Sequence, residues 1–370
     1  MRSLAFGFIA VTMWLFSVGT AHATTEFARR TLLSCGACHA VGIKLNDFGQ
    51  AYKSNHYVLP ALLPRGDVPV TLQAQAGYFS DGNTGLPKAI ADKVIAMAGG
   101  QVGSHWTLDA QQYVVDGGGV GNLREAWAEY TTSWNARVPV DVRVGQQVLP
   151  LPTDPERFKL SEADYAIDDQ VVGNNPFDLY GAMVGARLSI GKEIDGPSVS
   201  ILAVSNHDQG STILQTGTDW MFVGQEALGH ATFEAYRYTG RRALGGDDVF
   251  WRQGFGANAY VGRFTLNTMI QTGNDSDPLG TGVAIFSSGG YVQGTYQVGR
   301  STFAYAREDG VNDTAGNFGR DFVFGASTFV GRAFKIQLED VVTHSPQTHN
   351  SLALIFGVGA STLHVGSSSY

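Results

Sequence analysis

Cysteine is nearly missing from this chain of 370 residues, which has only Cys35 and Cys38. A zinc site would need two further ligands at fixed spacing, and His39 alone does not supply them. Lysine is scarce, and the net charge of −8 at pH 7 argues against a nucleic-acid partner. After the first 23 residues, no apolar run approaches the ~20 residues of a spanning helix. Two classes remain: a soluble β protein and a membrane β-barrel.

The N-terminus has the three parts of a secretory signal. Arg2 supplies a basic start, residues 4–18 form an apolar run, and Ala21-His22-Ala23 is a small-x-small cleavage site. The run is short for a membrane anchor, which is the weaker alternative. We therefore expect residues 1–23 to be a signal peptide and the exported chain to begin at Thr24.

The two cysteines belong to the motif Cys35-Gly36-Ala37-Cys38-His39. C-x-x-C-H is typical of covalent c-type haem attachment: both thiols form thioethers, and His39 is the proximal iron ligand. A disulfide across this short gap would be strained, and a thioredoxin-like motif would need a βαβ context that is not found here. The motif predicts one haem c.

The second axial ligand of the haem stays open. A methionine would raise the reduction potential, and Met183 and Met269 lie on the polar faces of predicted strands. His56 is close in sequence, and His105 is expected on the polar face of its strand. Each of these four residues is a weak candidate, and packing inside the barrel explains the methionines at least as well.

Residues 24–69 are too few to form a haem domain with a core of its own. The stretch from Leu45 to Tyr52 is predicted to be helical, and it places Phe48 and Tyr52 four residues apart on one face, where they could cover a porphyrin. Ordinary packing would explain these aromatics equally well. We expect this segment to be a short helical plug whose haem is enclosed by the rest of the chain.

Residues 70–370 alternate between polar and apolar side chains. The alternation is clearest in Thr71–Tyr78, Tyr180–Ile190, Gly262–Thr272 and Phe334–Val342. The polar faces carry charges and glycines, and the apolar faces end in Tyr, Trp or Phe, which favours a membrane barrel with a polar interior. We predict an all-β outer-membrane antiparallel barrel of about 16 strands, within an even range of about 14 to 18. The terminal aromatic Tyr370 is a modest further signal.

Turn residues recur between the predicted strands. They are Gly196-Pro197, Gly245-Gly246-Asp247-Asp248, Asn274-Asp275-Ser276-Asp277-Pro278, Asp309-Gly310 and Asn312-Asp313. Their carboxylates could attract cations, but aspartate is common in solvated turns, so no binding site is assigned to them.

Several motifs resemble the fused outer-membrane cytochrome–porins, a family that includes iron oxidases of iron-oxidising bacteria. They are Phe27–Thr31, Cys35–His39, Leu45–Tyr52, Val142–Gln146 and Leu149–Pro152. The resemblance implies a single c-type haem at the mouth or lumen of an outer-membrane barrel, with outer-membrane lipid around it. It also implies electron transfer from an extracellular donor, foremost Fe(II), and hence a possible Fe(II) oxidase.

One haem cannot bridge an apolar belt ~25 Å tall, so the electrons would leave to a periplasmic c-type cytochrome. Two alternatives remain open. One is a redox conduit for another donor or acceptor. The other is a diffusion porin whose haem segment senses or gates.

Overall fold

The structure is a computed structural model. It describes residues 70–80, 87–102, 105–134, 138–151, 159–168, 170–175, 177–191, 196–206, 217–243, 247–299, 301–330, 334–345 and 348–363, and the backbone of 39–41 and 44–45. Within these ranges, no helix is long and apolar enough to cross a membrane.

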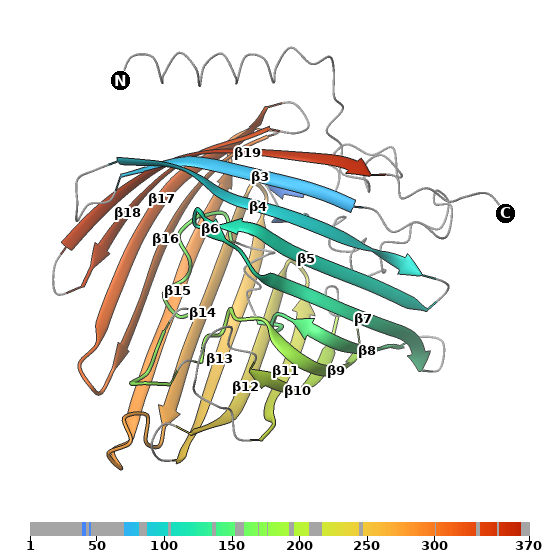
Figure 1. The fold of residues 1–370 in the computed structure, drawn as a ribbon, viewed down its shortest axis with the longest axis vertical. Helices are drawn as coiled ribbons and strands as arrows, with labels where there is room; N and C mark the ends of the chain where they lie inside the picture. The colour runs from blue at the N-terminus through green and yellow to red at the C-terminus, as the bar shows by residue number, and fades with distance from the viewer. Residues whose placement is uncertain are drawn as a thin grey trace.

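Sixteen long antiparallel strands close into one barrel (Figure 1), which confirms the predicted fold class and strand number. The strands are β3 (Val70–Ser80), β4 (Pro87–Val102), β5 (Trp106–Asp116), β7 (Leu123–Trp134), β8 (Val138–Gln147), β9 (Met183–Gly191), β10 (Ser198–Asn206), β11 (Asp219–Leu228), β12 (Ala231–Ala243), β13 (Asp247–Val261), β14 (Phe264–Asp275), β15 (Ile285–Gln297), β16 (Thr302–Asp313), β17 (Phe318–Val330), β18 (Phe334–His344) and β19 (Thr348–Leu363). A two-residue strand, β6 (Gly119–Val120), lies in the turn between β5 and β7. Pairing of β19 with β3 closes the ring.

The predicted alternation corresponds to the two faces of the wall. On β14, Ile270 is 63% exposed and Met269 is 1% exposed, so neighbouring residues face opposite sides. The outward set is mostly apolar, with exposed aromatics such as Phe264 and Tyr296 near one rim and Phe286 and Phe318 near the other. An apolar belt between aromatic rims is the outer wall of a membrane-spanning barrel.

The two rims differ in their connections. At the rim where β3 begins, Gly229-His230 and Gly262-Arg263 are two-residue turns. Gly229 and Gly262 have φ values of +63° and +59°, a backbone conformation that glycine adopts without steric cost. The longest connection, residues 148–182, leaves from the other rim. Because membrane barrels have short periplasmic turns, the rim of Gly229 and Gly262 is the periplasmic one.

Little of the predicted haem segment is described. The backbone of β1 (His39–Val41) pairs with β2 (Lys44–Leu45) in a small antiparallel hairpin, and β1 lies against β17 of the barrel. The rest of residues 24–69, including most of the predicted helical turn at Leu45–Tyr52, lies outside the described residues. The predicted signal peptide and Tyr370 do so as well.

Two local predictions were wrong. Asp309-Gly310 is not a turn but part of β16, because Asp309 faces inward and pairs with Arg307 (Nε–Oδ2 2.7 Å); the turn follows at residues 314–317. The strand expected from Tyr180 begins only at Met183. The carboxylate of Asp178 accepts a hydrogen bond from the Tyr180 backbone N–H (2.7 Å), which keeps this stretch in a bend.

Candidate functional site: the barrel lumen and its inward segment

Residues 159–181 fold into the barrel instead of projecting from its rim. This inward segment belongs to the connection between β8 and β9, yet it contacts the inner wall from β18 through β16, β15 and β13 to β12. In Figure 1 it is a thin green trace within the ring of strands. The segment therefore lines one half of the lumen, and we call the strands β12 to β18 the lined half.

The first anchor of the inward segment is Glu162. Its carboxylate pairs with Lys93 of β4 and accepts a hydrogen bond from Gln75 of β3 (2.8 Å). Burial raises the pKa of Glu162, but the ammonium group of Lys93 outweighs this effect, and the pKa falls to about 2. Glu162 is therefore ionised at neutral pH, and its charge holds the segment against the wall.

Two strand residues bind the backbone beside this anchor. The carboxylate of Glu339, on β18, accepts the N–H groups of Glu162 and Ala163, each at 2.9 Å. Arg307, on β16, donates to the carbonyl groups of Ala163 (3.0 Å) and Asp164 (2.7 Å). Hydrogen bonds from charged groups to buried backbone satisfy polar atoms that have lost water.

Aromatic side chains fix the middle and the end of the inward segment. Tyr165 stacks on Tyr291 of β15 with ring centroids 4.0 Å apart. Phe177 packs against Tyr238 of β12 at 4.4 Å and against Phe250 of β13 at 5.0 Å. All five rings are buried in one apolar cluster inside the barrel.

Asn175 joins the inward segment to the extracellular ends of two strands. Its side-chain amide donates to Asp275 of β14 (2.7 Å) and to Asp248 of β13 (3.1 Å). Asp275 is also paired with Arg252 (Nη1–Oδ2 2.7 Å), and neither side chain of this pair is more than 1% exposed. Asp248 and Asp275, expected on solvated turns, are thus buried inside the barrel.

The inner wall of β7 to β9, which we call the bare half, contacts the described segment at its extracellular end, where the Arg124 guanidinium of β7 lies 3.8 Å from the centre of the Tyr180 ring. Farther along the wall, side chains of these strands bind one another. Glu129 accepts hydrogen bonds from Arg143 (2.8 Å) and Arg187 (3.3 Å), and the Arg143 guanidinium lies 3.7 Å from the centre of the Trp127 ring. Asp141 lies on the same face of β8 as Arg143.

The lumen is acidic. Among the described residues, twelve carboxylates but four guanidinium groups are buried on the inner wall or on the inward segment. These carboxylates belong to Asp92, Asp109, Glu125, Glu129, Asp141, Asp168, Asp219, Glu234, Asp248, Asp275, Asp309 and Glu339, and the guanidinium groups to Arg187, Arg242, Arg252 and Arg307. Half-buried cations, namely Lys93, Arg124, Arg143, Lys159 and Lys335, are too few to reverse the excess.

The structure places three of the proposed haem ligands. Met183 and Met269 face the lumen, as predicted, and both are buried in the aromatic cluster, where Met183 Sδ lies 3.4 Å from the Tyr238 hydroxyl. His105 is exposed in the periplasmic turn before β5, and its Nδ1 lies 2.9 Å from the carbonyl oxygen of Thr131. Met183 begins β9 at the extracellular rim, whereas His105 lies at the periplasmic rim, so the two candidates are at opposite ends of the barrel.

The remaining ligand predictions cannot be placed. Cys35, Cys38 and His56 lie outside the described residues, and His39 is described only as backbone of β1. Within the described part of the chain, no cluster of three or more His, Cys, Asp or Glu side chains could hold a metal ion.

The inward segment was missed in the sequence, although a signal was present. Residues 148–182 lack period-two alternation and contain four prolines, which argues against further strands. They nevertheless carry large apolar side chains, among them Leu149, Leu160, Ile167 and Leu179, all of which are buried. An irregular but apolar connection of this length indicates a segment packed inside the barrel.

Solved structures that are similar to this chain include several outer-membrane barrels. An anion-selective porin from Comamonas acidovorans has a TM-score of 0.62 at 11% identity, covering 79% of this chain and 100% of that one. The loop-deleted OmpT of Vibrio cholerae scores 0.60 at 13% identity, with coverage of 80% and 100%. The channel DcaP of Acinetobacter baumannii scores 0.58 at 12% identity, with coverage of 79% and 96%. No family model and no curated protein matches the chain.

At these identities the similarity shows the fold alone: a porin-type barrel of the outer membrane. About a fifth of this chain lies outside each match. The similarity therefore supports the predicted barrel. It does not test the haem motif at Cys35–His39.

Proposed function

We propose that this protein is an outer-membrane diffusion channel with a preference for small cations. The observation that carries the proposal is the excess of carboxylates on the inner wall and on the inward segment. A cleft lined by one sign of charge between low-dielectric walls concentrates counter-ions and repels co-ions. The inward segment occupies part of the lumen, so we expect the passage to run along the bare half.

The test is the reversal potential of the purified full chain in planar bilayers under a potassium chloride gradient. A cation-selective channel gives a potential of the sign set by K⁺, and raising the salt concentration weakens it, because salt screens the wall charges. Anion selectivity or the lack of any conductance by well-folded protein would exclude the proposal.

A second function is favoured by a separate observation. The motif Cys35–His39 supplies the two thiols and the imidazole that covalent haem attachment needs, and the backbone hairpin that starts at His39 lies against β17. We propose that Cys35 and Cys38 bind one haem c, with His39 as proximal ligand, and that the chain passes electrons from an extracellular donor to a periplasmic cytochrome. Fe(II) is the foremost candidate for this donor.

In that function the haem would supply one-electron redox chemistry. The protein's part is to hold it near the barrel and to bring the donor close. An acidic lumen fits a cationic donor such as Fe(II), because the wall would raise its local concentration. Met183, Met269, His56 and His105 remain candidates for the second axial position.

Two measurements separate the functions. The absorbance of reduced haem c in protein expressed with its export and haem-attachment machinery tests the motif, and Cys35→Ser with Cys38→Ser should abolish it. Stopped-flow reduction by Fe(II) then tests the conduit. Absence of haem from the unaltered chain, with normal cation conductance, would reject the conduit and keep the channel, whereas haem reduction by Fe(II) without conductance would do the reverse.

A further inference from the structure

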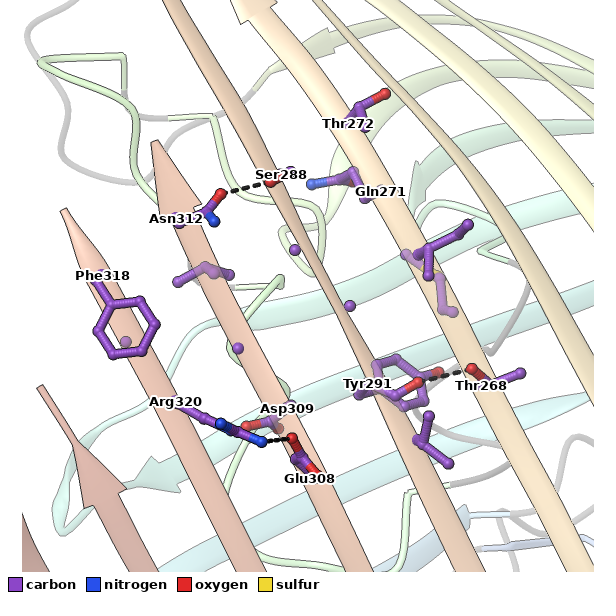
Figure 2. A pocket seen from close by; sticks show the side chains of 18 residues that line it. Thr268, Gln271, Thr272, Ser288, Tyr291, Glu308, Asp309, Asn312, Phe318 and Arg320 are labelled. Carbon is purple, nitrogen blue, oxygen red and sulfur yellow. Dashed lines mark hydrogen bonds and ion pairs between the residues drawn. The ribbon is translucent and has the colours of Figure 1, made fainter. Parts of the chain in front are cut away.

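The outer wall carries a polar notch on β14 to β17, with a volume of about 620 Å³. The row of the notch nearest the extracellular rim consists of Thr272, Ser288 and Asn312, which are neighbours in the register of β14, β15 and β16. Figure 2 shows these side chains and the hydrogen bond between Ser288 and Asn312. The volume lies within the range of about 300–1,000 Å³ that is usual for ligand sites.

Two glycines form the floor of the notch. Gly290 and Gly310 are paired on β15 and β16, two residues farther from the extracellular rim than Ser288 and Asn312. A Cβ atom on Gly290 would lie 2.5 Å from the backbone oxygen of Met269, and one on Gly310 would lie 3.0 Å from that of Gly319. A larger residue at either position would therefore press on the neighbouring strand, and the recess is part of the sheet itself.

An ion pair closes the deep end of the notch. Glu308 lies beside Val292, two residues deeper than Gly310, and Arg320 lies opposite Gly310. Nη2 of Arg320 pairs with Oε1 of Glu308, and the guanidinium group is 4.9 Å from the ring centre of Phe322, the residue opposite Glu308. The side chain of Arg320 therefore extends away from the extracellular rim and into the apolar belt.

The ion pair keeps binding capacity for a ligand. The side chains of Arg320 and Glu308 are 46% and 50% exposed, so about half of each faces the surroundings of the barrel. Among the described residues, the second carboxylate oxygen of Glu308 has no hydrogen-bond partner. A guanidinium group has five N–H donors, and a carboxylate accepts up to about four hydrogen bonds. The notch therefore offers both donors and acceptors.

The strand register gives the depth of the ion pair. Phe318 marks the extracellular edge of the apolar belt on β17, and Arg320 and Phe322 follow it by two and four residues. With a rise of ~3.3 Å per residue and a tilt of ~40°, these positions are about 5 Å and 10 Å below the edge. The notch therefore opens on the outer leaflet of the membrane, at the level where acyl chains begin.

The chemistry of the notch distinguishes between two kinds of lipid at this level. A diacyl phospholipid has ester carbonyl groups here, which accept hydrogen bonds and match Arg320 but not the Glu308 carboxylate. Lipid A, the acylated glucosamine anchor of lipopolysaccharide, has amide-linked chains with a hydroxyl group close to the sugar. Its amide and hydroxyl groups both donate and accept, so they match both members of the ion pair.

We propose that the notch binds lipid A through the upper part of one hydroxylated acyl chain. The chain lies on Gly290 and Gly310, and its hydroxyl group meets the pair of Glu308 and Arg320. The amide group and the sugar lie at the row that contains Ser288, while the phosphate groups stay at the membrane interface. Charged groups that face plain hydrocarbon are costly, and a ligand with its own polar groups at this depth removes much of that cost.

The experiment counts bound lipid by native mass spectrometry. The full chain is purified from outer membranes, freed of lipid by detergent exchange and titrated with lipid A or phosphatidylglycerol, and its folding is checked by heat-modifiable electrophoretic mobility. We expect one saturable lipid A site and much weaker binding of phosphatidylglycerol, which is also anionic. Ser288→Trp, which fills the notch from the outside, should lose this binding, and Val142→Trp on the outward face of β8 is the matched control that should keep it.

A second variant tests the polar contacts separately from the shape of the recess. Glu308→Leu with Arg320→Leu places apolar side chains on the lipid-facing wall, which suits the fold. Loss of a hydrogen bond to a charged group should weaken lipid A binding by about tenfold. Binding of phosphatidylglycerol should not fall, because its chains need no partner at this depth.

Four results would overturn the proposal. They are the lack of a saturable lipid A site, equal binding of the two lipids, lipid A binding that survives Ser288→Trp in folded protein, and lipid A binding that is unchanged in the double leucine variant. Equal binding would mean that the recess holds any acyl chain. None of these outcomes depends on conductance or on haem, so the test is independent of both proposed functions.

Discussion

The two halves of this barrel use the same strand pattern for different ends. In the lined half, β12 to β18, the inward segment covers the inner wall, and the outer wall bears the exposed ion pair of Glu308 with Arg320. In the bare half, β7 to β9, the inner charges bind one another, and the outer wall is apolar. Alternation alone does not distinguish them. What differs is whether each face meets protein, water or lipid.

A charged inner wall therefore has two uses. In the lined half, charges such as Asp275 and Glu339 bind backbone and amide groups of the segment. In the bare half, charges such as Glu129 and Asp141 face the space that remains. Substitutions should accordingly affect stability in the first half and ion passage in the second.

The largest expected effect is the loss of a buried ion pair in the lined half. Asp275→Ala leaves Arg252 without its partner and Asn175 without its closest acceptor. Breaking one side of a buried pair costs about 3–5 kcal/mol. We expect a lower temperature of thermal unfolding, measured by heat-modifiable mobility. Asp141→Ala is the control in the bare half, and an equal loss there would erase the difference between the halves.

The second prediction concerns the effect of low pH on Glu162, the first anchor of the inward segment. The pKa of Glu162 is lowered from 4.5 to about 2, so its contribution is complete above about pH 4.5 and is lost as the pH falls toward 2. At about 1.4 kcal/mol per pKa unit, the contribution is on the order of 3 kcal/mol. Burial raises the pKa of Asp178, so its protonation on acidification favours the docked segment and opposes this loss.

Glu162→Gln should remove most of the pH dependence of segment docking. Limited proteolysis of the segment in folded protein between pH 3 and pH 7 measures it. Asp164→Asn changes a half-exposed carboxylate two residues away and should leave the profile unchanged. An unaltered profile in Glu162→Gln would mean that another group titrates.

The strands of the barrel and the two faces of its wall could be predicted from the sequence. The features that could not be predicted have a physical reason in common: they depend on contacts that no local pattern specifies. Period-two alternation predicted the strands and their faces, because each strand has one apolar side against lipid. It could not show that Asp309 lies mid-strand, since aspartate followed by glycine is equally typical of a turn. The burial of this carboxylate is explained by the inward Arg307 beside it and by a hydrogen bond from the backbone of Ala166 in the inward segment.

The inward segment depends on contacts between distant parts of the chain. Glu162 meets Lys93 across 69 residues, and Tyr165 meets Tyr291 across more than a hundred. No local pattern specifies such partners. The haem prediction differs again, because Cys35, Cys38 and His39 form a purely local motif that a sequence alone can suggest. The described structure adds only the backbone hairpin that lies against β17.

A smaller effect is expected from the aromatic anchor. Tyr165→Leu keeps apolar volume but loses the stack on Tyr291 and the contact with the Arg307 guanidinium (4.5 Å), together about 0.5–1.5 kcal/mol. We expect brief openings of the segment, seen as added noise in single-channel current. Trp127→Leu removes a comparable aromatic–arginine contact in the bare half, one that involves no residue of the inward segment, and should leave the noise unchanged.

The smallest expected effect is on the cation selectivity of the channel. It depends on inward carboxylates of β5 and of the bare half. Asp109→Asn with Asp141→Asn removes two carboxylates from the inner faces of β5 and β8. Fewer negative charges along the passage lower the local cation concentration, so the cation-to-anion permeability ratio should fall by roughly twofold or more. Asp248→Asn is the counterpart in the lined half, where Asn175 and the Asp277 backbone N–H bind the carboxylate. If Asp248→Asn changed the reversal potential as much as the double substitution, ions would pass along the lined half, and the inward segment would not direct them.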